Sequence, residues 1–406
     1  MDPNLLRAVS RCGFEKPSDI QREAIPQALS GRDLMASAQT GTGKTAAFVL
    51  PALQRLLSPP VRGGNGPRVL VLTPTRELAT QVSEAIQALG RFTRLTAGAV
   101  VGGVPYPPQQ RLLRRPLDLL VATPGRLMDH MERGRVDFSR LELLVLDEAD
   151  RMLDMGFVDA VERIAAATPA DRQTLLFSAT FEGSIKRVVN RLLREPIRIE
   201  LDPVTAKHES ITQRVHQADH FDHKHDLLDR VLRDGEGDQA LVFTSTKKGA
   251  DALAKRLRET GHPSTSLHGD MSQHERRRAV EKLRSGRVRV MVATDVAARG
   301  LDIRSLALVV NFDLPNSPED YVHRIGRTGR GGDTGTAVSL IGRQDWPKLT
   351  RIERMTGQRL ERAVLEGLEP RYPEPRPAAG RPGNKRRGPP PRRNASGQRP
   401  PRRRTA

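Results

Sequence analysis

The sequence predicts an α/β protein with two tandem, doubly wound parallel-sheet domains and a disordered basic C-terminal tail. Short apolar, β-branched segments alternate with helical patterns, this alternation begins again near the middle of the chain, and the composition changes near residue 370. Continuous apolar strands separated by helices are typical of parallel sheets covered on both faces. Each round of the alternation therefore predicts one domain.

The first domain contains six segments with the length and composition of buried strands. They are DLMASA at 33–38, RVLVLTP at 68–74, LTAGAVVGG at 95–103, LDLLVATP at 117–124, LELLVLDEA at 141–149 and TLLFSAT at 174–180. Helical patterns lie between them, for example at 76–89. These segments predict a first domain at residues 1–203.

Five further segments predict a second domain of the same kind. They are ALVFTST at 240–246, STSLHGD at 264–270, VRVMVATD at 288–295, LALVVNFD at 306–313 and GTAVSLI at 335–341. Between the two sets the apolar periodicity lapses and polar residues cluster. We therefore expect a linker at 204–212 and a second domain at 213–368.

The tail, expected at 369–406, is rich in proline, glycine and arginine. From Arg371 onward, twelve basic residues stand against one acid, Glu374, so this part carries +11 of the formal net charge of +19. Such a composition cannot bury enough apolar surface to offset the entropy of ordering, which predicts disorder. The charge predicts a polyanionic partner.

Several classes of protein are disfavoured by the sequence. No run of 18 or more apolar residues is present, so we expect no membrane span. The first residues lack the pattern of a secretory signal. Cys12 is the one cysteine, which excludes an internal disulfide and a thiolate zinc site. A cytoplasmic location is the simplest expectation.

The segment AQTGTGKT at 38–45 lies between an expected strand and an expected helix. Gly41 and Gly43 allow consecutive amides to face a phosphate chain. Lys44 brings a positive charge to the β- and γ-phosphates, and Thr45 offers a hydroxyl to Mg²⁺. The following helix N-terminus adds a partial positive charge. The segment therefore predicts a nucleotide-binding loop.

One departure leaves an alternative open for this loop. The general phosphate-loop pattern has glycine where this chain has Ala38. A glycine-rich turn without a ligand is therefore the competing interpretation. The strand–loop–helix setting favours nucleotide binding.

Two carboxylates, Asp147 and Glu148, follow a buried apolar segment. Ligands of open α/β sheets bind at the carboxyl ends of the strands. Asp147 is placed to hold Mg²⁺ through its water shell, and Glu148 can orient and deprotonate an attacking water. Carboxylates that merely cap a helix are the alternative, which the nearby phosphate loop disfavours.

Eight short motifs in one order resemble the DEAD-box RNA helicase family (superfamily 2). They are AQTGTGKT at 38–45, PTRELA at 74–79, TPGR at 123–126, DEAD at 147–150, SAT at 178–180, LVFTST at 241–246, ATDVAARGLDI at 293–303 and HRIGRTGR at 323–330. The resemblance covers roughly residues 5–365 and is strongest to the bacterial RhlE-like branch. It implies two RecA-like domains and an ATP-dependent RNA helicase that unwinds short duplexes and remodels RNA or ribonucleoproteins.

The resemblance also implies ATP and Mg²⁺ as cofactors and assigns roles at the nucleotide site. Arg327 and Arg330 would reach the γ-phosphate as arginine fingers, so that turnover requires both domains. The implied catalytic residues are Glu148, Lys44, Asp147, Arg327 and Arg330. The implied metal ligands are Thr45 and Asp147. The implied nucleotide-binding residues are Phe14, Pro17, Gln21, Ala38, Gln39, Thr40, Gly41, Thr42, Gly43, Lys44, Thr45 and Asp302.

The segment GFEKPSDIQ at 13–21 is similar to the adenine-recognition element of the family. There Gln21 would hydrogen-bond the adenine edge, and Phe14 and Pro17 would shape the pocket. The family usually has an aromatic residue about seventeen positions before the glutamine, and no residue before Phe14 is aromatic here. Adenine affinity is the property that this departure affects.

Further residues match family positions that couple the domains or touch RNA. Ser178, Thr180 and His323 would couple hydrolysis to strand separation, and Arg324 would support the interface. The implied RNA contacts are Thr75, Arg76, Gly103, Thr123, Gly125, Arg126, Thr244, Gln273, Arg276, Thr294 and Arg299. Short hydroxyls, glycine amides and arginines hold phosphates without reading bases, although the same residue types also serve ordinary loops and caps.

The resemblance makes RNA the expected partner, recognised largely without sequence preference. The ribosome and the RNA-degradation machinery are candidate partners, and we expect a monomer that does not bind membranes. Histidines at 208, 216, 220, 223 and 225 raise a metal-binding alternative, but a solvated linker face is the preferred interpretation.

Three rival functions compete with this interpretation, and two of them are disfavoured. A non-catalytic RNA scaffold would have lost Lys44, Glu148 or the arginine fingers, all of which are present. A DNA translocase usually carries other motif strings and further domains. An ATP-gated RNA clamp has the same residues as a helicase, so the sequence alone does not separate these two.

Overall fold

All eleven segments predicted as strands form strands in the computed structural model, which describes residues 1–37, 42–178, 181, 185–201, 211–235, 239–298, 306–329 and 334–374. The predicted α/β class with two parallel sheets is therefore confirmed. The expected disordered tail lies outside the described residues from position 375 onward.

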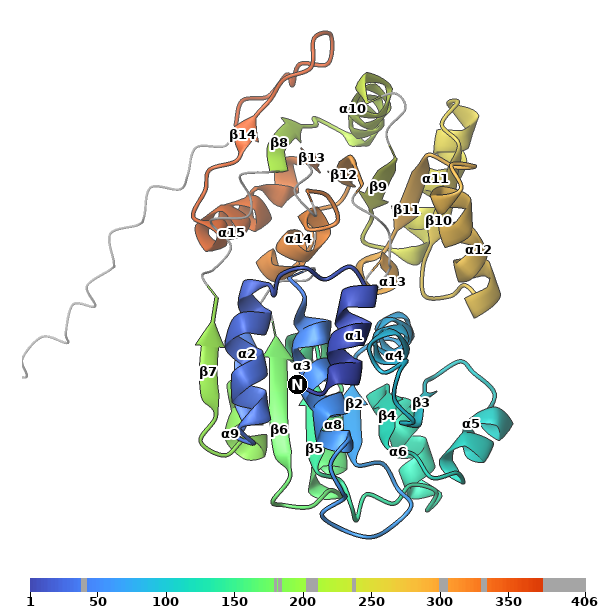
Figure 1. The fold of residues 1–406 in the computed structure, drawn as a ribbon. Coiled ribbons are helices and arrows are strands. Elements are labelled where there is room, and N and C mark those ends of the chain that lie inside the picture. The colour runs from blue at the N-terminus through green and yellow to red at the C-terminus, as the bar shows by residue number, and fades with distance from the viewer. Residues whose placement is uncertain are drawn as a thin grey trace, which may run out of the picture. The chain divides into compact units, whose positions relative to one another are not determined.

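The first lobe is built on the sheet β1–β7 (Figure 1). Its strands are β1 Leu34–Ser37, β2 Val69–Leu72, β3 Ala97–Val100, β4 Leu119–Ala122, β5 Leu143–Leu146, β6 Gln173–Ser178 and β7 Ile197–Glu200. Its helices are α1 Pro3–Arg11, α2 Asp19–Leu29, α3 Lys44–Leu56, α4 Arg76–Leu89, α5 Tyr106–Leu113, α6 Pro124–Glu132, α7 Ala149–Asp154, α8 Val158–Ala166 and α9 Ile185–Leu192.

The second lobe is built on the sheet β8–β14. Its strands are β8 Ile211–Gln217, β9 Ala240–Phe243, β10 Ser264–Leu267, β11 Val290–Ala293, β12 Leu308–Asn311, β13 Gly335–Ile341 and β14 Glu361–Arg362. Its helices are α10 Phe221–Asp234, α11 Lys247–Glu259, α12 Gln273–Arg284, α13 Asp295–Ala298, α14 Pro318–Ile325, the 3-10 turn η2 Arg343–Asp345 and α15 Trp346–Thr356.

The two sheets share one topology. The orders are β3-β4-β2-β5-β6-β1-β7 and β10-β11-β9-β12-β13-β8-β14. When the strands of each sheet are counted from its own first strand, both orders read 3-4-2-5-6-1-7. All pairings are parallel, for example Val69 with Leu143 and Ala240 with Leu308. The carboxyl ends of the strands therefore lie at one edge of each sheet, where α/β proteins bind ligands.

Strand side chains alternate between two cores, which explains the continuous apolar runs. In β2, Val69 and Val71 pack with α3 and α4, while Leu70 and Leu72 pack with α6–α9. In the second lobe, Val242 faces the cluster of α10 and α11, and Phe243 faces that of α12 and α13. Burial on both faces leaves little room for polar residues inside the strands.

Three strands were missed by the sequence interpretation: β7, β8 and β14. β7 (IRIE) and β8 (ITQRVHQ) mix apolar with polar residues and are partly exposed, and β14 has two residues. A search for continuous apolar runs does not detect such strands. β8 begins at Ile211, so the last two residues of the expected linker belong to the second sheet. Residues 204–210 lie outside the described part.

The prediction of a solvated face for the interdomain histidines is wrong for His216, His223 and His225, which are buried, whereas His220 is exposed. His223 Nε2 lies 3.1 Å from the carbonyl of Leu368, and the His225 ring packs 5.0 Å from that of Phe312. His220 caps α10 by accepting from the amide of His223. Among the described residues no cluster of His, Cys, Asp and Glu is arranged to hold a metal ion.

Within the described part of the chain, no helix is both long and apolar enough to cross a membrane.

Arg324 organises the carboxyl edge of the second sheet. It is fully buried and forms a bidentate pair with Asp295 at 2.6 and 2.8 Å. It also donates to Asn311 Oδ1 at 3.0 Å and to the carbonyl of Asp313 at 2.6 Å. The expected support of an interface by Arg324 is therefore corrected: its guanidinium is used inside the second lobe.

Replacing Arg324 by methionine is expected to destabilise the second lobe by about 3–5 kcal/mol, because Asp295 would keep its charge without its buried partner. Urea unfolding followed by fluorescence measures this, since Trp346, the one tryptophan, lies in that lobe. Arg230→Met is the matched control: it breaks an exposed pair with Asp234 and should cost about 0.5 kcal/mol. Equal losses in both variants would contradict this prediction.

Candidate active site

The described end of the phosphate loop leads directly into α3. Gly43 is the N-cap and has a left-handed backbone with φ of 94°. A Cβ at this position would also crowd the side chains of Gln21 and Ser18, and the left-handed backbone favours glycine. Lys44 begins the helix and is buried, whereas Thr45 is half-buried. Ala38, Gln39, Thr40 and Gly41 lie outside the described residues.

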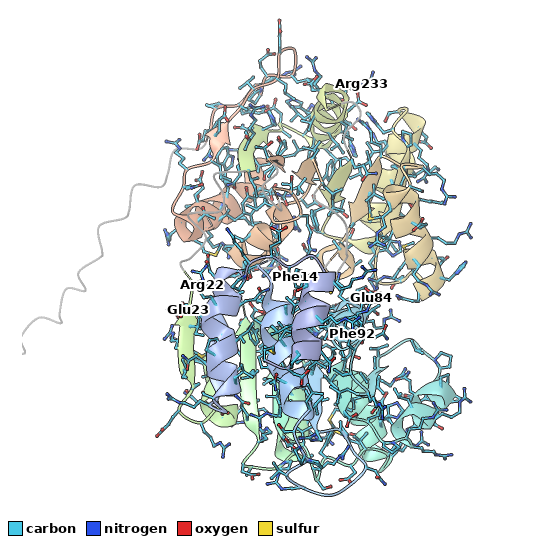
Figure 2. The ribbon with its side chains drawn as sticks, in the orientation of Figure 1. Phe14, Arg22, Glu23, Glu84, Phe92 and Arg233 are labelled. Atoms are coloured by element: carbon cyan, nitrogen blue, oxygen red, sulfur yellow. The ribbon has the colours of Figure 1, made fainter. Side chains whose placement is uncertain are left out.

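The adenine-recognition element contacts this loop. Gln21 Nε2 donates to the carbonyl of Gly43 at 3.1 Å, and Gln21 Oε1 accepts from the amide of Ser18 at 3.0 Å. Both the Nε2 and the Oε1 of the Gln21 amide are therefore hydrogen-bonded within the protein. Pro17 is exposed, and the exposed ring of Phe14 follows α1 (Figure 2). The adenine contact of Gln21 stays a prediction.

Asp147 and Glu148 follow β5, as expected, and both are buried. Glu148 has a left-handed backbone with φ of 52°, which is unusual for a residue with a side chain. Such strain is stored mostly at functional sites. The turn separates the two carboxylates at the start of α7, so that they have different surroundings.

The two carboxylates have opposite pKa shifts. Burial is the main cause that raises the pKa of Asp147 to about 7, although Lys44 opposes it. Burial also raises the pKa of Glu148, but the positive charges of Arg151, Lys44, His323 and Arg327 together outweigh it and lower the pKa to about 2. Glu148 is therefore ionised at neutral pH, as a general base must be.

The lowered pKa of Glu148 also indicates that the charges of two second-lobe side chains act on this carboxylate. His323 and Arg327 belong to the HRIGRTGR segment at the end of α14, and both lower the pKa of this first-lobe carboxylate. Arg327 is buried. A second connection joins Arg276 Nη2 to Glu77 Oε1 at 3.0 Å. Arg330 and Asp302 lie outside the described residues.

Mg²⁺ fits the residues present. Asp147 Oδ1 is buried and has no hydrogen-bond partner among the described residues. Burial of an unpaired carboxylate oxygen is costly unless a cation compensates it. The oxygen donors of Asp147 and Thr45 are of the type that Mg²⁺ prefers.

Three strands of the first sheet bring the predicted RNA residues together. Thr75 and Arg76 follow β2, Gly103 follows β3, and Thr123, Gly125 and Arg126 follow β4, and these strands are neighbours. The loop after β3 forms hydrogen bonds with residues of the other two segments. The carbonyl of Gly102 accepts from Arg76 at 3.1 Å, its amide donates to Thr123 Oγ1 at 3.3 Å, and the carbonyl of Val104 accepts from Arg126 at 2.6 Å.

The second lobe places its RNA candidates at the same edge of its sheet. Thr244 follows β9 and Thr294 follows the neighbouring strand β11, while Gln273 begins α12. Arg276 is buried, and its Nη2 contacts Glu77 Oε1 and the carbonyl of Ala297, so at least this end of the guanidinium binds protein groups. Arg299 lies outside the described residues.

Of the coupling residues, Ser178 ends β6 and is fully buried, whereas Thr180 lies outside the described part.

The sequence interpretation missed Arg151, which is buried and forms an ion pair with Glu148. It lies three residues after Glu148, a spacing that places both on one side of a helical turn. This spacing of three residues was the signal by which the sequence could have indicated that Arg151 pairs with Glu148. Among the neighbouring charges, that of Arg151 lowers the pKa of Glu148 most, so it helps to keep this carboxylate ionised.

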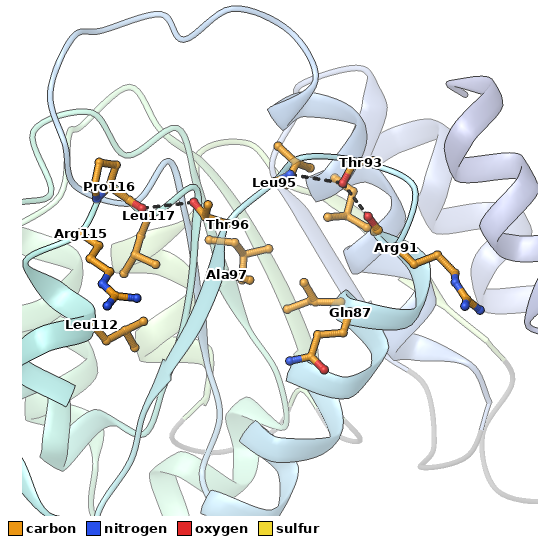
Figure 3. Close-up of a pocket in the computed structure, with 14 residues that line it drawn as sticks. Gln87, Arg91, Thr93, Leu95, Thr96, Ala97, Leu112, Arg115, Pro116 and Leu117 are labelled. Atoms are coloured by element: carbon orange, nitrogen blue, oxygen red, sulfur yellow. Dashed lines mark hydrogen bonds between the residues drawn. The ribbon is translucent and has the colours of Figure 1, made fainter. Parts of the chain in front are cut away.

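A cavity of about 490 Å³ lies elsewhere on the first lobe (Figure 3). Its walls include Leu53 of α3, Gln87 of α4, Thr96 before β3, Leu112 of α5 and Arg115 in the connection to β4. These are the amino ends of β3 and β4, whereas the predicted site residues follow the carboxyl ends. The cavity is therefore separate from the candidate active site.

The fold and this site define a class of protein: a phosphate-loop nucleotide hydrolase with two similar α/β lobes. Models of two families match the chain, the DEAD/DEAH box helicase at residues 18–188 and the helicase conserved C-terminal domain at residues 223–332. The chain belongs to the DEAD/DEAH box helicase family.

Named relatives agree with this assignment. The chain is 46% identical over 377 residues to the ATP-dependent RNA helicase SrmB of Haemophilus influenzae, covering 93% of this chain and 86% of the relative. It is 44% identical to SrmB of Escherichia coli, covering 92% and 85%. These relatives do not test the expected likeness to the RhlE-like branch, which stays a prediction.

Solved structures resemble the whole two-lobe region. Yeast (S. cerevisiae) Dbp5 bound to RNA and ADP BeF3 matches with a TM-score of 0.80 and 34% identity, covering 89% of this chain and 94% of that one. Mss116p bound to ssRNA and AMP-PNP matches with a TM-score of 0.80 and 27% identity, covering 91% and 78%.

Proposed function

We propose that this protein is an ATP-dependent RNA helicase that couples ATP hydrolysis to RNA binding, local duplex unwinding and remodelling of RNA or ribonucleoproteins. The observation that carries the proposal is the composite environment of Glu148: a first-lobe carboxylate kept ionised by charges that include second-lobe His323 and Arg327. Family membership supports the same activity. RNA-bound Dbp5 and Mss116p support RNA as the ligand.

In this mechanism Lys44 binds the phosphates and Glu148 accepts a proton from the attacking water. Arg327 stabilises the charge that develops on the transferred phosphoryl group. Thr45 and Asp147 would hold Mg²⁺, which supplies charge neutralisation at the phosphates when bound. Because each lobe contributes part of this set, turnover requires both, and linkage demands that RNA which favours the productive state also favours ATP binding.

ATP turnover measured with RNA, with DNA and without nucleic acid, beside strand displacement from a short RNA duplex, tests the proposal. RNA-stimulated turnover with displacement supports a helicase. Stimulation without displacement would identify an ATP-gated clamp instead. ATP turnover at the same rate with and without RNA would overturn the proposal.

The remaining assignments are proposals of the same kind. The lobes are assigned to residues 1–203 and 211–368, because β8 of the second sheet begins at Ile211. The first-lobe cluster of Arg76, Thr123 and Arg126 supports backbone binding of RNA. We also propose a cytoplasmic monomer, with the ribosome and the RNA-degradation machinery as candidate partners.

The basic tail is proposed to tether RNA by charge. Deleting residues 371–406 is expected to lower RNA affinity on the order of tenfold near 50 mM salt and little near 300 mM, because phosphate contacts release counterions. ATP turnover without RNA should not change. A chain with the same tail residues in scrambled order is the control and should bind like the intact protein. Equal affinity with and without the tail at low salt would refute the tether.

A further inference from the structure

Tyr106, a residue outside the eight motifs, contacts the arginine of the TPGR motif. Tyr106 begins α5, and Arg126 lies in the first turn of α6. The Arg126 guanidinium carbon lies 4.2 Å from the centre of the Tyr106 ring, and that of Arg133 lies 4.8 Å from it. Both distances are within the range of cation–π attraction. One ring therefore holds two guanidiniums at this place.

The same tyrosine also binds the acid that competes for Arg126. Its hydroxyl donates to Asp129 Oδ2 at 2.8 Å, while Arg126 Nε lies 3.7 Å from that oxygen. The second anchor of Arg126 is the carbonyl of Val104 at 2.6 Å. With its ring and its hydroxyl, Tyr106 thus controls how far the Arg126 guanidinium turns toward Asp129.

The other groups around this ring add no competing charge. His130 is fully buried and packs edge-on against Tyr106, with ring centres 5.6 Å apart. Its pKa is lowered, chiefly by burial and then by Arg126, so it stays neutral near pH 7. Arg133 is exposed. Arg126 in the first turn of α6 and Arg133 at its C-cap therefore place two positive charges around Tyr106, against the one negative charge of Asp129.

We propose that Tyr106 is a positioning residue for RNA binding, which orients Arg126 and adds Arg133 as a further phosphate contact outside the motifs. This inference rests on the proposed RNA-binding function and deepens it. A guanidinium holds a phosphate best through two parallel hydrogen bonds, so its orientation matters as much as its charge. Fixing the side chain before RNA arrives also lowers the entropy lost on binding.

The test measures the affinity of the full chain for single-stranded RNA at several salt concentrations. Tyr106→Leu is expected to weaken binding about tenfold, and Tyr106→Phe, which keeps the ring, by no more than about threefold. The Leu variant should also lower the slope of log affinity against log salt by about 0.7, the share of one phosphate contact. Tyr106→Leu removes no charge of its own, so a lower slope would show that an arginine–phosphate contact has been lost. A purely structural role would leave the slope unchanged.

A double-mutant cycle separates this inference from the proposed function. Arg126→Gln should weaken binding, and Tyr106→Leu should have a smaller effect in this background than alone, because the Arg126 contact is already lost. Arg133→Gln should lower the slope by about 0.7 as well, whereas Arg230→Gln, which removes an exposed arginine of α10, is the control and should not. If Arg126→Gln has no effect, the proposed RNA surface fails. If Arg126→Gln weakens binding but the Tyr106 effect is absent or fully additive, the positioning role is overturned.

Discussion

Replacing Arg327 by glutamine is expected to slow RNA-stimulated ATP turnover by about 10³–10⁵-fold. Arg327 is a buried second-lobe side chain whose charge lowers the pKa of first-lobe Glu148. A guanidinium at this place can stabilise the charge that develops on the phosphoryl group, and glutamine cannot. Steady-state phosphate release at saturating ATP and RNA measures the effect.

Two further variants sharpen this experiment. Arg327→Lys keeps the positive charge but loses the planar fork of donors, so it should recover little of the activity. Arg351→Gln removes an exposed arginine of α15 and should leave turnover unchanged. Turnover of Arg327→Gln within about threefold of the intact protein would contradict a transition-state role.

Replacing Glu148 by glutamine is the second large effect that we expect, a loss of about 10²–10⁴-fold in turnover. The amide has the shape of the carboxylate but cannot accept the proton of the attacking water. Since the pKa of Glu148 is about 2, the carboxylate is ionised throughout the neutral range and the substitution removes a real base. Single-turnover hydrolysis separates this chemical step from product release.

ATP binding should persist in Glu148→Gln, because Lys44 and the phosphate loop are intact. Glu259→Gln, which alters an exposed pair of α11 with Lys255 at 3.8 Å, is the matched control and should hydrolyse ATP normally. Rapid single-turnover hydrolysis by Glu148→Gln would show that another group activates the water.

Much of the fold could be predicted from the sequence, because the burial of a strand determines which residue types it contains. Strands such as β2 and β5 are buried on both faces, so their residues are apolar without interruption and were predictable. β7 and β8 mix polar and apolar residues because they are partly exposed. Their place in a sheet depends on pairing with distant strands, which leaves little local signal.

The candidate site divides in the same way. Lys44 begins the helix after the phosphate loop, Asp147 and Glu148 directly follow the predicted strand β5, and their residue types indicate their chemistry. Arg276 was expected to face RNA, yet the structure pairs it with Glu77, nearly two hundred positions away in the chain. Arg324 was expected to support an interface, yet it is buried inside the second lobe, where it forms an ion pair with Asp295. Long side chains reach partners that sequence spacing does not specify.

The sequence by itself determined the two-sheet class, the phosphate loop and the order of the motifs, because apolar periodicity, glycine and charge act over a few neighbouring residues. The tertiary structure alone decided the opposite pKa shifts of Asp147 and Glu148 and the stacking of Arg126 on Tyr106. Those properties arise from burial and from charges brought close by folding, and both depend on distances that a linear sequence does not contain.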